Sequence, residues 1–369
     1  MSTVVAEVLP LAGFTVAITA ERRRDELDAL LRRRGARVVS APTITIVPLL
    51  DDDALHAATA ACVALAPDVV VATTGIGFRG WLEAAEGWGI GDALRAGMAD
   101  ARLLARGAKP CGAIRAAGLT EHWSAPGESC EEILAQLLAE GVAGRRIAVQ
   151  LHGGPQTSFV EVLRSAGADV VEVPVYRWQA RPDATPVRRL VDQIVGGQVD
   201  AVTFTSAPAV TSLLDAAGTS VPGMVSALSG RVLAVCVGEV TAAPLRALGV
   251  PALVPSRARL GALVKAVTDA LPERAVRVAV AGSTLELRGH AVVVDGAVHT
   301  LAPASMTILG VLAARPGAVI SRAHLAAALP GGADGHAVDM AVARLRTALG
   351  SPHFVETVIK RGYRLRVDA

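Results

Sequence analysis

Aromatic residues are scarce in this sequence of 369 residues, where Phe, Trp and Tyr together make up only 3%. Hydrophobic residues still reach 52%, since alanine supplies much of that share. No run of 18 apolar residues lacks a charge or a Pro or Gly break, so we expect no transmembrane helix. The start, MSTVVAEVLPLAG, lacks the basic segment and the cleavage pattern of a signal peptide. We therefore expect a cytoplasmic protein with no membrane partner and two or three domains.

Cysteine is also rare. The four cysteines form no CxxC pair and no metal-finger spacing; they are Cys62, Cys111, Cys130 and Cys236. We predict buried free thiols in a reducing compartment, and no metal site.

Charge is small overall but unevenly placed. The net charge is +2, yet from residue 276 onward ten Lys and Arg face six Asp and Glu, which gives +4 there and −2 before it. A basic terminal module on a mildly acidic body indicates nucleic-acid binding in one part of the chain.

The chain contains an internal duplication. Residues 68–85, DVVVATTGIGFRGWLEAA, and 200–217, DAVTFTSAPAVTSLLDAA, share one design: a strand, a hydroxyl-bearing turn and a helix. The match extends on both sides, pairing 12–42 with 143–174 and 102–119 with 231–250. A repeat of this length predicts two similar domains rather than a solenoid.

Strands and helices alternate through both repeats, as in the strand 16–19 and the helix 24–34, or in the helices near 52–65 and over 76–86. Val-rich strands between amphipathic helices imply parallel sheets covered on both faces. In such sheets, ligands bind beyond the carboxyl ends of the strands. The residues that follow these ends are Thr19, Thr73, Thr74, Gly107, His152, Thr205, Ser206 and Gly238.

The extended segments 44–50 and 173–180 follow equivalent points in the two repeats. We expect them to pair as a two-stranded connector.

Residues 75–80 read Gly-x-Gly-x-x-Gly between a strand and a helix, which resembles a dinucleotide-binding fingerprint. The motif follows the third strand of its repeat, however, and the equivalent residues 207–212 contain no glycine. We interpret it as a tight turn rather than as a site for NAD or FAD.

Several motifs together resemble uroporphyrinogen-III synthase over about residues 12–270. They are the turns Thr73-Thr74 and Thr205-Ser206, SAPGESCEEILAQLL at 124–138, VPVYRW at 173–178 and VGEVTAAPLRALG at 237–249. The resemblance implies an α/β fold with two flavodoxin-like parallel-sheet domains joined by a two-stranded linker. The first domain would comprise 1–47 and 177–270, and the second 50–173.

That family closes hydroxymethylbilane into uroporphyrinogen III without a cofactor, inverting the last pyrrole ring. The resemblance implies an acid that helps the substrate hydroxyl to leave as water, and Tyr176 matches the linker tyrosine that is the candidate for this role. Eight substrate carboxylates call for hydroxyls, helix N-termini and cations. The candidates are Thr19, Arg22, Thr73, Thr74, Lys109, His152, Thr205, Ser206 and Thr241.

Each candidate also has a plainer interpretation. The hydroxyls can simply cap the helices that follow them. Arg22, Arg79 and Lys109 can be solvated surface charges, and His152 an ordinary loop histidine. One departure from the family also matters: the first repeat has Gly107-Ala108-Lys109-Pro110-Cys111 where the second keeps Gly238-x-x-Thr241-Ala242. The lost hydroxyl can weaken catalysis or mark conversion of the pocket into a sensor.

The pattern changes after residue 275. Residues 276–302 read as antiparallel strands with an Asp295-Gly296 hairpin. A helix then runs from 303–305 to Ala314, Ser321 caps a second, and Gly335 precedes a third that ends at Gly350. One face of this third helix carries Val338, Val342, Leu345 and Leu349, and 354–367 forms a second hairpin.

Residues 276–369 resemble the winged-helix domain of OmpR-type response regulators, with HAVDMAVARLRTALG as the recognition helix and ETVIKRGYRL as the wing. The resemblance implies promoter DNA as a partner and allows a homodimer on it. The residues expected to face DNA are His336, Met340, Ala343, Arg344 and Thr347, with Arg346, Lys360, Arg361 and Arg364 as phosphate or minor-groove cations. An ordinary solvated face is the alternative, and Asp339 is expected to make a structural cap or ion pair. Ile359-Lys360 replaces the usual Arg-Gly pair of the wing.

No phosphorylatable receiver domain is recognisable, so any signal would enter through the synthase-like lobes. We therefore expect a transcriptional regulator that retains cyclase activity on hydroxymethylbilane. The alternative is a catalytically inactive sensor of a tetrapyrrole or another acidic ligand. The third possibility is an enzyme whose C-terminal part serves only as a spacer. The basic recognition helix argues against it.

Overall fold

The computed structural model describes residues 8–49, 52–153, 157–329, 331 and 333–367, and within them the side chains of all but residues 152 and 157. The chain divides into two compact units, one of residues 45–179 and one of residues 1–44 with 180–369. Among the described residues, no helix is long and apolar enough to cross a bilayer. The same residues contain no group of three His, Cys, Asp or Glu that could hold a metal ion.

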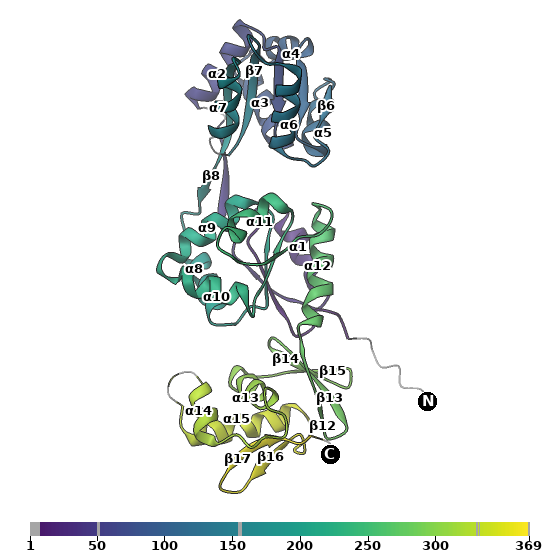
Figure 1. Ribbon diagram of the computed structural model, residues 1–369, viewed down its shortest axis with the longest axis vertical. Helices are drawn as coiled ribbons and strands as arrows, with labels where there is room; N and C mark the ends of the chain where they lie inside the picture. Colours follow the sequence, from purple (N-terminus) through teal and green to yellow (C-terminus); the bar gives the residue numbers. More distant parts are fainter. Residues whose placement is uncertain (1–7, 50–51, 154–156, 330, 332, 368–369) are drawn as a thin grey trace, which may run out of the picture. The chain divides into compact units, whose positions relative to one another are not determined.

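The unit 45–179 is built on one six-stranded sheet. The order is β3 (Ile44–Pro48), β8 (Asp169–Ala180), β7 (Arg146–Gly153), β4 (Val69–Ala72), β5 (Arg102–Ala105) and β6 (Trp123–Ser124). The pairs from β8 to β6 are parallel. Its helices are α2 (Asp53–Ala64), α3 (Gly75–Gly87), α4 (Gly91–Ala99), α5 (Ala108–Ala116), α6 (Cys130–Glu140) and α7 (Thr157–Ser165) (Figure 1).

Both faces of this sheet are covered, which explains why its strands are continuously apolar. Val70 and Ala72 of β4 pack with α2 to α5, whereas Val69 and Val71 pack with α6 and α7. Alternate residues of one strand thus enter two different cores.

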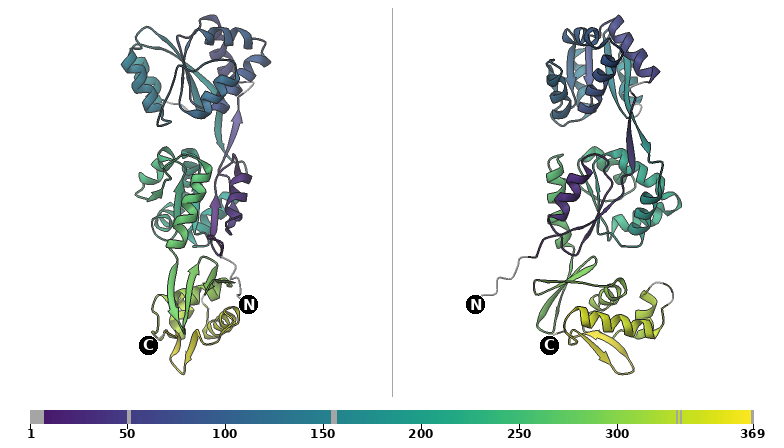
Figure 2. Two further views of the ribbon diagram at one scale, coloured as in Figure 1. Left: turned by 90° about the vertical axis from the view of Figure 1, so that its right-hand side faces the viewer. Right: turned by 180° about the vertical axis from the view of Figure 1, so that it is seen from behind.

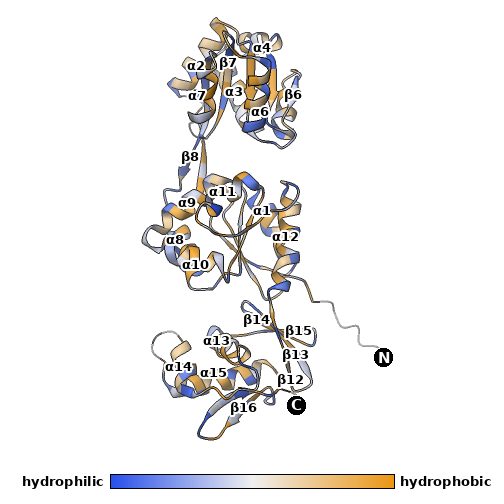
Figure 3. Cartoon of the chain, viewed as in Figure 1, coloured by the Kyte–Doolittle hydropathy of each residue, from blue (hydrophilic) through white to orange (hydrophobic). Residues whose placement is uncertain are grey.

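The other unit contains a five-stranded parallel sheet of the same kind. The order is β11 (Ala252–Leu253), β10 (Leu233–Cys236), β9 (Ala201–Phe204), β1 (Thr15–Ile18) and β2 (Arg37–Ser40). Helices α8 (Thr185–Val195), α9 (Ala207–Ala217), α10 (Val221–Ser229) and α11 (Glu239–Arg246) cover one face, and α1 (Arg24–Arg32) and α12 (Leu260–Glu273) the other (Figure 2). Apolar and polar residues alternate around α12 in Figure 3, as expected of an amphipathic helix on a sheet.

The strand order in both units is flavodoxin-like, so the predicted fold class is confirmed. The predicted pairing of the two extended segments is confirmed as well, because β3 and β8 are neighbours in one sheet and Leu49 N–H donates to Val175 O at 3.2 Å. Residue 50 of the predicted connector lies outside the described residues. The helix α4 was not predicted.

The C-terminal part of the same unit is a winged helix. An antiparallel sheet of β12 (Val276–Val280), β13 (Ser283–Arg288), β14 (Ala291–Val294) and β15 (Ala297–Thr300) precedes α13 (Pro303–Ala313), α14 (Arg322–Ala328) and α15 (Gly335–Ala348). The hairpin of β16 (Val355–Val358) and β17 (Gly362–Leu365) ends the fold. The four residues predicted for the inner face of α15 are all buried.

Local signals in this domain are mostly confirmed. Asp295 and Gly296 have φ of 46° and 84°, which fits the two-residue turn between β14 and β15. Ser321 caps α14 by accepting a hydrogen bond from His324 N–H. The prediction that Gly335 precedes the third helix was wrong by one residue: Asp334 is the N-cap, accepting from Ala337 N–H at 2.8 Å, and Gly335 is the first helical residue.

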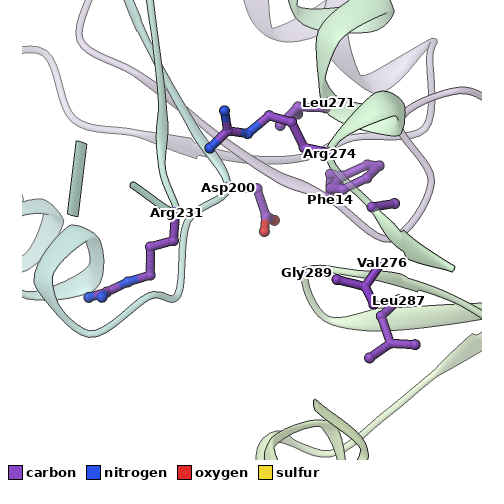
Figure 4. A pocket seen from close by; sticks show the side chains of 9 residues that line it. Phe14, Asp200, Arg231, Leu271, Arg274, Val276, Leu287 and Gly289 are labelled. Atoms are coloured by element: carbon purple, nitrogen blue, oxygen red, sulfur yellow. The ribbon is translucent and has the colours of Figure 1, made fainter. Parts of the chain in front are cut away.

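The turn between β13 and β14 docks on the amino end of β1. His290 N–H donates to Gly13 O at 2.9 Å. The buried Arg288 guanidinium donates to Ala12 O at 3.2 Å and lies over the Phe14 ring. Asp200 accepts from Thr15 N–H and points toward Gly289 in Figure 4, at a cleft of about 420 Å³. This cleft lies at the amino edge of the sheet, opposite the rim where the sequence predicts a ligand.

Candidate active site and DNA-binding surface

Thr73 and Thr74 link the end of β4 to the start of α3. Thr73 is buried, and its hydroxyl donates to Gln150 O at 2.8 Å. Thr74 is the N-cap of α3, where its Oγ1 accepts a hydrogen bond from Gly77 N–H at 3.2 Å. Thr74 therefore does cap its helix, but its oxygen has further partners.

Gln150 supplies those partners, and the sequence analysis missed it. This fully buried residue of β7 accepts from Thr74 N–H through Oε1 at 3.2 Å and donates from Nε2 to Thr74 Oγ1 at 3.0 Å. A second Nε2 bond goes to Leu151 O at 3.1 Å. The available signal was its position: in the repeat alignment Gln150 stands where the other repeat has Thr19.

Tyr176 of β8 comes to the same place. Its side chain is largely buried, and its hydroxyl lies 3.4 Å from Thr74 Oγ1. The Trp178 ring packs edge-on against it, with 6.2 Å between ring centroids. The structure thus brings together the candidate acid and the first hydroxyl turn.

Two glycines of the Gly-x-Gly-x-x-Gly motif make this close packing possible. A Cβ on Gly77 would lie inside van der Waals distance of Gln150 Nε2 and 2.8 Å from Thr74 Oγ1. A Cβ on Gly75 would lie 2.9 Å from the carbonyl carbon of Lys109. The motif therefore has a packing role as a tight turn.

The next turn along this rim carries Lys109 and Cys111, both on α5. The Lys109 side chain is exposed, whereas Pro110 and Cys111 are buried, and Pro110 is the residue that matches Thr241 of the other repeat. All four cysteines are free, as predicted, although Cys130 is only partly buried. Burial raises the pKa of Cys62 to about 11 and that of Cys236 to about 12, so these thiols stay protonated at neutral pH.

The hydroxyls of the other unit behave differently. Thr19 is fully buried, and its Oγ1 donates to Thr203 O at 2.8 Å. Ser206 occupies the N-cap position of α9, yet its side chain makes no capping bond. Within the described part of the chain, the hydroxyls of Thr205, Ser206 and Thr241 have no hydrogen-bond partner. Thr74 therefore caps its helix, whereas Ser206 does not.

The structure gives fewer contacts for the remaining residues that were considered for substrate binding. Arg22 and Arg79 are exposed and form no ion pair with any described residue. The side chain of His152 lies outside the described residues.

The recognition helix α15 exposes all five residues that were predicted to face DNA from it. His336, Met340, Ala343, Arg344 and Thr347 are all exposed. The Thr347 hydroxyl, however, donates to Ala343 O of its own helix at 3.1 Å. On the hairpin, Lys360, Arg361 and Arg364 are exposed, and Arg364 pairs with Glu356 at 2.8 Å. Ile359 is 82% exposed at the tip, beside Lys360 in a left-handed conformation with φ of 59°.

Arg346 differs from the other cations of this surface. Its guanidinium donates twice to Val355 O, at 2.9 and 2.6 Å, and once to Thr357 Oγ1 at 2.9 Å. It also lies over the Tyr363 ring, 5.8 Å from the centroid. Arg346 thus fastens α15 to the hairpin.

A second group of contacts, around Asp339, also holds α15 to the hairpin, and the sequence predicted only part of it. Asp339 accepts from Arg322 at 2.8 Å and from Tyr363 Oη at 2.6 Å, so the predicted ion pair is confirmed. The hydrogen bonds from Tyr363 and Arg322 hold the pKa of Asp339 below its usual value. Asp339 is therefore a link between α14, α15 and the hairpin.

Comparison with known proteins agrees with this geometry. Residues 25–265 match the family model of uroporphyrinogen-III synthase HemD, and residues 296–365 match that of the C-terminal domain of transcriptional regulatory proteins. An uncharacterized protein YjjA of Bacillus subtilis (strain 168) is 30% identical over 257 residues, 69% of this chain and 94% of that protein.

Two solved structures align with different parts of the chain. A mutant uroporphyrinogen III synthase from the extremely thermophilic bacterium Thermus thermophilus is 29% identical and aligns with a TM-score of 0.60, covering 71% of this chain and all of that one. The RstA DNA-binding domain of Klebsiella pneumoniae, in complex with its RstA box, is 28% identical over 24% of this chain and 96% of that chain, with a TM-score of 0.22. The chain belongs to the uroporphyrinogen-III synthase family and carries a C-terminal winged-helix domain of the OmpR type.

Proposed function

We propose that the protein is a transcriptional regulator whose body cyclises hydroxymethylbilane to uroporphyrinogen III and whose winged helix binds promoter DNA in the cytoplasm. The observation that carries the enzymatic part is the contact between the hydroxyls of Tyr176 and Thr74 at 3.4 Å. This contact places the candidate proton donor Tyr176 beside the N-terminus of α3, and helix N-termini bind anions. The chain also belongs to the synthase family.

In this scheme Tyr176 gives its proton to the substrate hydroxyl as the carbon–oxygen bond breaks, and water leaves. A ring carbon then attacks the resulting azafulvene. The main task of the protein is to hold the substrate so that the less obvious carbon attacks. We assign carboxylate binding to the N-termini of α3 and α9 and to Thr19, Thr73, Thr74, Thr205, Ser206, Thr241, Arg22, Lys109 and His152.

For DNA, we assign α15 to the major groove and the β16–β17 hairpin to the minor groove, within a domain of residues 276–369. The exposed face of α15 and the cations of the hairpin support this assignment. The synthase domains would comprise 1–47 with 177–270, and 50–173.

A coupled assay of hydroxymethylbilane cyclisation tests the enzyme. We expect uroporphyrinogen III from the wild type and a fall of about two orders of magnitude in kcat for Tyr176→Phe. Product no faster and no richer in isomer III than the spontaneous reaction would eliminate the cyclase.

The second candidate is a sensor that binds a tetrapyrrole without turnover. It is favoured by Pro110, which stands where the other repeat keeps the Thr241 hydroxyl. Promoter pull-down with and without uroporphyrinogen III, alongside the cyclisation assay, distinguishes the two candidates. A sensor changes its DNA binding with ligand and makes no product.

DNA binding has its own test. Affinity for promoter fragments should fall steeply with salt, and Arg344→Ala combined with Arg361→Ala should weaken it. Unchanged binding of this double variant would contradict the assignment.

A further inference from the structure

The cleft of about 420 Å³ at the amino edge of the five-stranded sheet has no part in the proposed activities. Its volume lies within the range of about 300–1,000 Å³ that is typical of small-molecule sites. The synthase-like part supplies Asp200 and Arg274 to its lining, and the winged helix supplies Leu287 and Gly289. Both parts belong to one compact unit, so a molecule bound there would contact the two domains at once.

The Asp200 carboxylate points into this cleft without a counter-ion (Figure 4). Its Oδ2 accepts from Thr15 N–H at 2.7 Å, whereas its Oδ1 has no partner among the described residues. Burial raises the pKa of Asp200 to about 6, so the group is mostly ionised at neutral pH. The neighbouring wall includes Leu271 from the last turn of α12, and a helix C-terminus also favours positive charge. This side of the cleft therefore suits a cation.

A guanidinium lines the same cleft. Arg274 donates to Gly230 O and forms no ion pair with any described residue. A guanidinium carries five N–H donors, so several remain for an anionic group. Arg231 lines the cleft as well, but its guanidinium points away from Asp200 in Figure 4 and donates to Val195 O. Arg274 is therefore the better placed cation for an anionic group in the cleft.

The rest of the lining is mostly apolar. Phe14, Leu271 and Leu287 are 4%, 2% and 9% exposed, so their side chains form a well-packed wall. Val276 is 52% exposed, which places it at the open side of the cleft. An apolar wall beside one unpaired anion and one unpaired cation suits a small molecule that carries both charges on an apolar body.

We propose that this cleft binds a small zwitterion with an apolar body, of the chemical class of the apolar α-amino acids. The ammonium group of the ligand pairs with Asp200, its carboxylate pairs with Arg274, and its side chain packs on Phe14 and Leu287. The cleft lies at the edge of the sheet opposite the substrate rim, so the ligand acts as an effector at the junction and the inference does not rest on the cyclase.

Isothermal titration calorimetry of the full chain at neutral pH tests the site with three probes. L-phenylalanine should bind with a Kd below about 1 mM. The probe 2-phenylethylamine lacks the carboxylate and 3-phenylpropanoate lacks the ammonium group, so each should bind at least about tenfold more weakly. No binding of L-phenylalanine, or binding of either single-charge probe as tight as that of L-phenylalanine, would overturn the inference.

Two substitutions test the assignment of the charged groups. Asp200→Asn keeps an acceptor for Thr15 N–H, and it should weaken L-phenylalanine about tenfold without weakening 3-phenylpropanoate. Arg274→Met should weaken L-phenylalanine by a similar factor without weakening 2-phenylethylamine. Asp215→Asn and Arg189→Met, at exposed positions of the same unit outside the cleft, are the matched controls and should bind as the wild type does. Binding of L-phenylalanine that survives both cleft substitutions would place it elsewhere on the chain and overturn the inference.

Discussion

The Asp200 carboxylate accepts a hydrogen bond from Thr15 N–H at 2.7 Å, which ties the amino ends of β9 and β1 together. Gly289 of the winged-helix sheet packs directly on this carboxylate, since a Cβ there would lie 2.8 Å from Asp200 Cγ. Burial raises the pKa of Asp200 to about 6, and the single bond from Thr15 lowers it less. The junction between the synthase body and the DNA-binding domain therefore contains a carboxyl group that binds its proton more tightly than an ordinary aspartate.

The first prediction concerns pH. Because the folded-state pKa of Asp200 is raised, its protonated form stabilises the fold fully below about pH 4, and this contribution is lost as the pH rises through about 6. The free energy of unfolding from urea titration should thus fall by about 1–3 kcal/mol between pH 4.5 and 7.5 on account of this group. Asp200→Asn keeps an acceptor for Thr15 N–H and should remove that fall. Asp215→Asn, at an exposed position, serves as the control. An unchanged pH dependence in Asp200→Asn would refute the assignment.

The second prediction concerns the contact of Gly289 with Asp200. Gly289→Ala should destabilise the unit by about 2–4 kcal/mol, because the new methyl group meets both Asp200 and Gly13 O and the residue has a positive φ of 38°. Gly350→Ala is the matched control: its φ is +69°, but nothing lies within 4 Å of the added Cβ. It should cost only about 1 kcal/mol. Thermal unfolding of both variants measures the difference, and equal losses would show that the contact is unimportant.

The third prediction concerns two glycines of one helix. Gly77→Ala should displace the Gln150 amide from Thr74 and lower cyclase kcat about tenfold. Gly80→Ala, on the same helix with open space around its Cβ, should stabilise the protein by about 0.5–1 kcal/mol and leave kcat unchanged. If both substitutions affect the rate equally, the close approach at Gly77 has no catalytic role.

Features with a strong local period or turn chemistry could be predicted from the sequence. The buried face of α15 follows from the spacing of Val338, Val342 and Leu345, and the β14–β15 turn from Asp295-Gly296. The repeat likewise revealed Thr74 as a rim residue.

What escaped prediction depends on contacts between distant segments. Gln150 sits inside an apolar strand, and its importance appears only when β7 brings its amide to Thr74. Arg346 looks from the sequence like another cation for DNA, because nothing local shows that the hairpin folds back onto its guanidinium. The N-cap of α15 was misplaced by one residue, although Asp334 is the better N-cap type and its side chain does accept from Ala337 N–H.

The last prediction separates the two neighbouring arginines of α15. Arg344 is exposed, whereas Arg346 holds the carbonyl of Val355 and the hydroxyl of Thr357. Arg346→Met should therefore lower the stability of the winged helix by about 1–3 kcal/mol, since Val355 O loses a charged donor while the aliphatic stem is kept. Arg344→Met should leave the stability within about 0.5 kcal/mol but weaken promoter binding and reduce its salt dependence. Urea unfolding and binding at several salt concentrations measure the two effects. Should Arg346→Met unfold like the wild type, its bonds to the hairpin contribute nothing, and Arg346 returns to the set of cations available to DNA.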